Sequence, residues 1–182
     1  MKKLIILLIS IVALTTSCSI KKEKTVFENP SKSITVTFEL NSNKTPIYKV
    51  SYKNNIVLDS SQLGIIREDA NFYTNLKIVK ITEPKLIEDS YVMLQGKQKK
   101  ISYSANQYTV HLQNEAGSLI DIIFQLSDDG IAFRYHFPET STEIKRIVEE
   151  KTTYNMNQNT KAWLQPMSKA KSGWSETNPS YE

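Results

Sequence analysis

The chain has 182 residues, of which 40% are hydrophobic and 23% are charged, a composition that fits one globular domain with enough apolar residues for a core. The formal net charge is +4, but Lys2 and Lys3 belong to a predicted leader, and without them 21 basic residues face 19 acidic residues. This surplus of two is small, and no stripe of Lys and Arg alternates with aromatic residues, so nucleic-acid binding is not indicated.

The first 18 residues have the pattern of a bacterial lipoprotein signal peptide. A positive start precedes an apolar run at 4–14 that suits a secretory signal and is too short to span a bilayer as a helix. Thr15-Thr16-Ser17-Cys18 resembles a lipidation site, and acyl chains on Cys18 would anchor the mature chain to a membrane. The alternative is an ordinary signal peptide with an incidental cysteine. We therefore predict a periplasmic or outer-membrane lipoprotein in the cell envelope of a Gram-negative bacterium, with residues 19–26 as a polar tether.

Cysteine usage limits how the fold can be stabilised. Cys18 is the only cysteine, so internal disulfides and cysteine-based metal motifs are excluded. Burial of apolar residues must therefore supply the stability.

Short strands are predicted immediately after the tether. Residues 34–40 alternate apolar and polar, as do residues 48–52, and a period of two predicts strands with one buried face. Asn54 and Asn55 are expected to form a hairpin turn, because Asn accepts left-handed backbone angles. The short returning strand is placed at 56–58.

The middle of the chain gives weaker signals. Residues 60–66 read as a helical turn or as a loop or bent strand, and the glycine at 64 favours the latter. Residues 76–81 alternate without a clear apolar face. Two weaker strands, 91–94 and 101–104, are predicted on either side of a lysine-rich loop at 96–100.

The strongest pattern lies between Leu119 and Pro138, after another alternating strand at 108–113. Apolar residues alternate along both halves of this stretch, and Asp128-Asp129-Gly130 between them is typical of a tight turn. Two antiparallel strands are therefore predicted, the second ending at the proline, which has no N–H for a ladder.

One segment is ambiguous from its residues. Residues 143–151 have apolar spacing that fits a helix, whereas Thr and Tyr at 149–155 favour a strand. Elsewhere short strands separated by polar turns indicate an all-β sandwich or barrel.

The sequence IIFQLSDDGIAFRYHFPE at 122–139 resembles the N-terminal domain of glycoside hydrolase family 97, which contains bacterial α-glucosidases and α-galactosidases. NPSKSITVTFEL at 29–40, YKVSYKNNIVLDSSQLGI at 48–65 and KAWLQP at 161–166 support the resemblance. It implies an antiparallel β-sandwich of the galactose-mutarotase-like type over 27–182, with residues 143–151 as strand. It also implies a partner, the catalytic (β/α)₈ barrel that follows the sandwich in this family.

Candidate catalytic residues are scarce. Glycoside hydrolysis uses paired carboxylates, and the chain has four acidic pairs: Glu68/Asp69, Glu88/Asp89, Asp128/Asp129 and Glu149/Glu150. All but the last are predicted at turns or loops, where a solvated surface charge is the favoured interpretation. His111 and His136 lie on the polar faces of predicted strands, and a surface or inter-sheet role is favoured over a catalytic pair. No catalytic residue is therefore assigned.

The C-terminal segment holds the candidate binding residues. Trp163, Trp174 and Tyr181 are spaced among polar residues without strand alternation, and such rings can stack on sugars or fill a domain interface. Alternatively, Trp163 covers the edge of the sandwich. The resemblance implies a calcium site shared with the barrel, and by that likeness Glu182 is the candidate ligand.

Three functions remain open. The first is the N-terminal sandwich domain of a glycoside hydrolase that acts on α-glucosides or α-galactosides, packing on the barrel and completing its sugar pocket, with no hydrolysis by this chain alone. The second is a stand-alone, lipid-anchored carbohydrate-binding module that holds an α-linked oligosaccharide. The third is an envelope lipoprotein that binds other proteins through a sheet edge.

Overall fold

The computed structural model describes residues 24–163, and within them every strand pairing is antiparallel and no residue is helical. No helix in this part of the chain is therefore long and apolar enough to cross a membrane. The strands are β1 (Thr25–Glu28), β2 (Ile34–Leu40), β3 (Pro46–Tyr52), β4 (Asn55–Gln62), β5 (Ile65–Arg67), β6 (Ala70–Phe72), β7 (Lys77–Ile81), β8 (Lys85–Val92), β9 (Lys100–Gln113), β10 (Leu119–Ser127), β11 (Ile131–His136), β12 (Ile147–Glu150) and β13 (Asn155–Met156).

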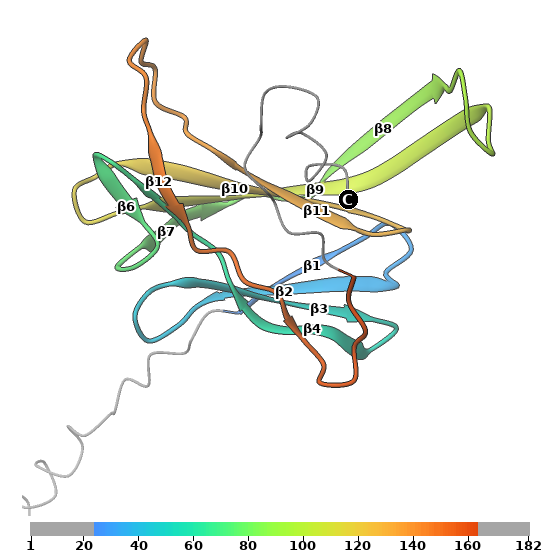
Figure 1. Cartoon of the computed structure of the whole chain (residues 1–182), viewed down its shortest axis with the longest axis horizontal. Helices are drawn as coiled ribbons and strands as arrows, with labels where there is room; N and C mark the ends of the chain where they lie inside the picture. The colour runs from blue at the N-terminus through green and yellow to red at the C-terminus, as the bar shows by residue number, and fades with distance from the viewer. Residues whose placement is uncertain (1–23, 164–182) are drawn as a thin grey trace, which may run out of the picture.

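The strands form two facing layers and a smaller sheet beside them (Figure 1). The first sheet has the order β1-β2-β3-β4-β13, and the second sheet has the order β11-β10-β9-β7, with β8 also paired to β9. The side sheet has the order β12-β5-β6. Beyond the layers, β8 and the start of β9 project as a two-stranded ribbon (Figure 1). The all-β antiparallel sandwich predicted from the sequence is confirmed.

Aromatic rings from both layers form the centre of the core. The side chain of Phe124 on β10 is fully buried. Its ring centroid lies 5.3, 6.0, 6.2 and 6.5 Å from those of Phe27, Phe38, Phe133 and Tyr48, respectively. The alternation along β10 therefore has the predicted consequence, because every second side chain enters the space between the sheets.

The hairpin between β10 and β11 also matches its prediction, whereas two other boundaries do not. The turn between β3 and β4 has left-handed angles at Lys53 and Asn54, with φ of 47° and 65°, and Asn55 already belongs to β4. It therefore lies one residue earlier than predicted. The two strands predicted at 101–104 and 108–113 are one continuous strand, β9. Sequence alternation missed this because the burial pattern slips between the two halves of β9.

The first strand begins close to the predicted start of the domain. β1 starts at Thr25, so the last two residues of the predicted tether belong to the first strand. The ambiguous segment at 143–151 contains strand β12, as the family resemblance implied, and this strand pairs with β5.

Gly64 permits a close approach between the β4–β5 connection and Tyr73. A Cβ atom at Gly64 would lie 2.8 Å from Cδ2 and 2.9 Å from Cα of Tyr73. We expect Gly64→Ala to lower the free energy of unfolding by about 1–3 kcal/mol, because the backbone of Tyr73 must move. Urea titration followed by circular dichroism measures this. Gly130→Ala is the matched control, since a Cβ there meets nothing within 4 Å, and an equal loss in both variants would contradict the steric explanation.

Candidate interface at the open side of the sandwich

The predicted binding residues are mostly outside the described part of the chain. Cys18, Trp174, Tyr181 and Glu182 lie outside residues 24–163, so their predicted roles stay predictions. Trp163 is the last described residue, and its side chain is 87% exposed. A ring this exposed buries little of the sandwich edge, and the predicted binding role of Trp163 stays a prediction.

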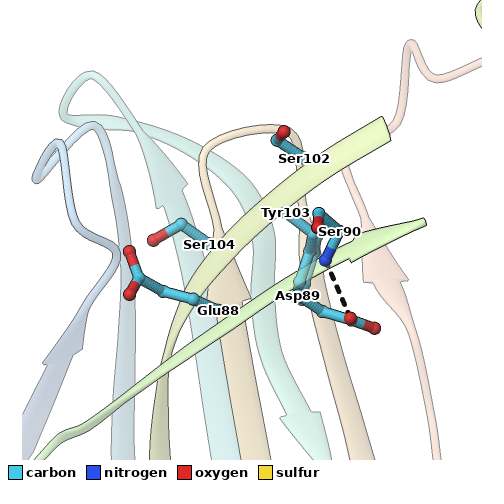
Figure 2. A pocket seen from close by; sticks show the side chains of 6 residues that line it. All are labelled: Glu88, Asp89, Ser90, Ser102, Tyr103 and Ser104. Atoms are coloured by element: carbon cyan, nitrogen blue, oxygen red, sulfur yellow. Dashed lines mark hydrogen bonds between the residues drawn. The ribbon is translucent and has the colours of Figure 1, made fainter. Parts of the chain in front are cut away.

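The acidic pair Glu88/Asp89 was wrongly predicted to lie in a loop, because both residues belong to β8. Consecutive strand residues point to opposite faces, and Figure 2 shows the two side chains directed away from one another across the ribbon. Asp89 accepts a hydrogen bond from the backbone N–H of Ser90 at 2.8 Å. The surrounding hollow of about 500 Å³ is lined by serines and Tyr103 of β9. Its two carboxylates cannot act on one bond as acid and base.

The pair Asp128/Asp129 is at a turn, as predicted, and has a structural role. Asp128 Oδ1 accepts hydrogen bonds from Asn29 Nδ2 at 2.6 Å and from the backbone N–H of Ser31 at 3.1 Å. Asp129 accepts one from the hydroxyl of Ser127. The β10–β11 turn is thereby fixed to the loop that follows β1.

Of the pair Glu68/Asp69, Asp69 belongs to a cluster around a buried arginine, whereas Glu68 accepts a hydrogen bond from the backbone N–H of Arg146 at 3.1 Å. The side chain of Arg67 is 3% exposed, and its guanidinium contacts Asp69 Oδ1 and Glu139 Oε1, each at 2.5 Å. The same guanidinium lies 5.4 Å from the ring centroid of Phe72 and 4.7 Å from that of Phe137. Arg67 therefore joins the side sheet to the segment that follows β11, through both charge and stacking. We call Arg67, Asp69, Phe72, Phe137 and Glu139 the Arg67 clamp.

The Arg67 clamp predicts a specific loss of stability in acid. Hydrogen bonds from Arg67, and to a smaller extent from Lys145, hold the pKa of Asp69 below its ordinary value. A carboxyl group whose pKa is lowered by folding stabilises the protein above its unfolded pKa, and this contribution is lost as the pH falls through the folded pKa. We expect Asp69→Asn to lower the thermal midpoint at pH 7, and its difference from the natural chain to vanish between about pH 5 and pH 2. Calorimetric melts across this range test it, and a difference independent of pH would contradict it.

A second polar cluster lies on the outer face of the second sheet. Asp121 Oδ1 lies 2.6 Å from His111 Nδ1, and Asp121 Oδ2 lies 3.1 Å from His136 Nδ1. The three residues are cross-strand neighbours on β9, β10 and β11. Both histidines lie on the polar face, as predicted, and they cover the carboxylate so that Asp121 is only 6% exposed. The sequence did not single out Asp121, because strand register alone brings it between the histidines.

No metal centre is evident in this part of the protein. Among residues 24–163, no three His, Cys, Asp or Glu side chains are grouped so that they could hold a metal ion.

The two long sides of the sandwich differ. On one side, the rings of Phe27 on β1 and Tyr108 on β9 stack with centroids 4.5 Å apart. The hydroxyl of Tyr108 donates to the carbonyl of Glu28 at 3.0 Å, and Asn106 Nδ2 donates to the same carbonyl at 2.9 Å. Direct contact between the sheets thus closes this side.

The other side is open between β11 and the β3–β4 part of the first sheet. Cavities of about 520 and 550 Å³ lie there, and both are lined by Val50, Val57 and Ile131. They form one trough, which we call the open-side groove; its main lining residues are Tyr48, Val50, Val57, Ile131, Phe133 and Tyr135. Its lining is largely apolar and aromatic, which suits an interface.

One end of the open-side groove is closed by the segment after β12. The hydroxyl of Tyr135 accepts from the backbone N–H of Gly64 at 2.8 Å and lies 2.7 Å from the hydroxyl of Thr152. The hydroxyl of Tyr48 donates to the carbonyl of Thr153 at 3.3 Å. Burial raises the pKa of Tyr48 and of Tyr135 above that of an ordinary phenol. Sequence reasoning gave no sign of this groove, because it arises where two sheets diverge.

The described residues thus define an antiparallel β-sandwich protein with one side left open, and comparison with known families makes this more specific. The family model described as "Glycosyl-hydrolase 97 N-terminal" matches residues 18–182. The chain belongs to this family, as the sequence resemblance indicated.

Solved structures support the same fold. A β-arabinopyranosidase crystal structure is similar with a TM-score of 0.78 and 32% identity, over 88% of this chain and 26% of that one. Glycoside hydrolase family 97 enzymes from Pseudoalteromonas sp. strain K8, in complexes with panose and with acarbose, match with a TM-score of 0.65 and 24% identity. These matches cover 74% of this chain and 20% of theirs.

A curated relative is also an enzyme. The protein named "Probable retaining alpha-galactosidase" from Streptomyces bingchenggensis (strain BCW-1) is 27% identical over 116 residues, which are 64% of this chain and 18% of that protein. The chain therefore spans only about a quarter or less of the relatives that it matches.

Proposed function

We propose that this chain serves as the N-terminal sandwich of a glycoside hydrolase acting on α-glucosides or α-galactosides. In this role it packs on a catalytic (β/α)₈ barrel supplied by polypeptide outside this chain and completes the sugar pocket of that barrel. The observation that carries the proposal is the family match over 18–182, together with relatives in which the matched part is 26% or less of an enzyme.

The relatives favour the galactoside side of this substrate range. One is named as an alpha-galactosidase and another as a beta-arabinopyranosidase. A β-L-arabinopyranoside has the ring configuration of an α-D-galactopyranoside and lacks only the hydroxymethyl group. Both substrates therefore belong in an assay, beside an α-glucoside.

Calcium, the lipid anchor and the location complete the proposal. Glu182 would supply one oxygen ligand to a calcium ion shared with the barrel, and the other oxygens would come from the barrel, since calcium takes six to eight. Acyl chains on Cys18 would hold the enzyme at a membrane of the cell envelope. The leader pattern supports the anchor, and the family resemblance supports the calcium ion.

The stand-alone carbohydrate-binding module is the less favoured alternative. The matching relatives are enzymes several times longer than the matched region. The open-side groove is apolar and has the character of a protein interface rather than of a sugar site rich in hydrogen-bonding groups.

Calorimetric titration of residues 19–182 with maltose, galactose and calcium separates the two functions. We expect no saturable heat from any of them, alongside a cooperative thermal melt, because the sites are completed only by the barrel. Saturable sugar binding by the chain alone would favour the module.

A second experiment tests the enzymatic role directly. The full chain is fused, after Glu182, to the part of the β-arabinopyranosidase relative that follows its matched region. We expect the fusion to hydrolyse an aryl β-L-arabinopyranoside or α-galactoside faster than that catalytic part alone. Equal rates would contradict the proposed function.

A further inference from the structure

We propose that the open-side groove and the free edge of β11 receive one extended β-strand from the polypeptide that follows this domain in its relatives. The inference rests on the proposed function, because it names the surface through which the domain joins the rest of the enzyme. The added strand extends the second sheet at β11 and directs every second side chain into the groove.

The backbone of β11 has N–H and C=O groups on its outer edge that could pair with such a strand. Among residues 24–163, β10 is the partner of β11 on one side, and β11 ends the sheet on the other. The backbone N–H of Ser127 donates to the carbonyl of Gly130 at 3.0 Å. Hydrogen-bonded pairs recur at every second residue of an antiparallel ladder, so the residues between them direct their N–H and C=O groups to the opposite edge. These residues are Ile131, Phe133 and Tyr135, and within the described part of the chain no strand pairs with them on this edge.

The side chains beside this edge are apolar and partly exposed, so an added strand could cover them. The pleat directs the side chains of Ile131 and Phe133 toward the first sheet, where Phe133 lies 5.7 Å from Tyr48 between ring centroids. Phe133 and Ile131 remain only partly buried, and Val57 across the groove is 53% exposed. Apolar surface next to unpaired backbone is the combination that an added strand satisfies at once.

Two sources could supply the added strand: a second copy of this chain, or the polypeptide outside the matched region in the relatives. A second copy of this chain could pair its own β11 with this edge, but the Phe133 side chain of that β11 already packs on Tyr48 of its own first sheet and so would not fill the groove. Each relative, by contrast, has at least 74% of its length outside the matched region, which is ample polypeptide for one strand. On the closed side, Phe27 and Tyr108 stack directly between the two sheets, so the added strand enters at β11.

Amide hydrogen exchange tests the backbone part of the inference. The samples are the full chain and the fusion described above. We expect the N–H groups of Ile131 and Phe133 to exchange at least about 100-fold more slowly in the fusion. Those of Ala132 and Arg134 already bond to β10 and should change little, so they serve as internal controls on the same strand.

Matched variants test the side-chain part. Val57→Asp changes a groove residue that is 53% exposed, and Val79→Asp changes a residue on β7 that is 55% exposed and lies outside the groove. In the chain alone we expect similar, small shifts of the thermal midpoint. In the fusion, Val57→Asp should lower the midpoint by at least about 5 °C more than Val79→Asp, because the aspartate is buried there.

Each contrary outcome has a distinct meaning. Unchanged exchange at β11 in a fusion that is more active than its catalytic part would overturn the strand proposal and leave the proposed function intact. Protection of β11 that rises with the concentration of the chain alone would replace the added strand by a second copy. A fusion with neither protection nor added activity would overturn both proposals.

Discussion

Phe124→Ala should destabilise the sandwich by about 3–5 kcal/mol, which is a large part of the stability of an ordinary domain. Phe124 is fully buried, and four aromatic rings from both sheets lie within 6.5 Å of its centroid. Truncation removes the transfer free energy of the ring and leaves a cavity that stiff neighbouring rings fill poorly. Chemical denaturation of residues 19–182 measures the loss, and a variant that does not fold at all also agrees with it.

Ile144→Ala provides the control for this change. Ile144 is 94% exposed on the segment between β11 and β12, so its truncation should alter the free energy of unfolding by less than about 0.5 kcal/mol. A loss below about 1.5 kcal/mol for Phe124→Ala would show that the two sheets do not pack through this ring.

Most of the fold could be predicted from the sequence, because alternating apolar and polar residues mark the buried and exposed faces of a strand. β10 buries the residues that its pattern selects, and the Asp-Asp-Gly turn joins it to β11 as predicted. The ribbon of β8 and β9 was less readable, since much of it is exposed on both faces and selection for apolar residues is weak there. The same lack of a buried face explains why Glu88 and Asp89 were predicted in a loop.

The candidate interface could not be predicted from the sequence, because it depends on how strands far apart in the chain are stacked and in which register they pair. Val57 and Ile131 face one another across the open-side groove only after two sheets have been stacked. The link from Asp121 to two histidines likewise requires the register of three strands. Binding roles were predicted for aromatic residues near the C-terminus, because rings spaced among polar residues without strand alternation can be recognised in the sequence alone.

Arg67→Met should be the most destabilising change of a charged residue among 24–163, with an expected loss of about 3 kcal/mol. The substitution keeps a long apolar side chain between Phe72 and Phe137 but removes the charge that Asp69 and Glu139 share. Both carboxylates are 36% exposed and can recover some hydration, which places the loss at the lower end for a broken buried ion pair. Arg67→Lys should retain little of the stability, since an ammonium cannot form two bidentate contacts or stack as a plane.

Lys49→Met is the matched control, because it removes one charge from an exposed ion pair instead of from a buried one. Lys49 Nζ lies 2.7 Å from Asp59 Oδ1, yet the two side chains are 36% and 51% exposed. Solvent screening makes the contribution of such an exposed pair to stability small. Denaturant titrations of the two Met variants should therefore differ several-fold at equal loss of charge. Equal losses would mean that the Arg67 clamp contributes no more than a surface pair, and that the segment after β11 is held to the side sheet by its aromatic contacts alone.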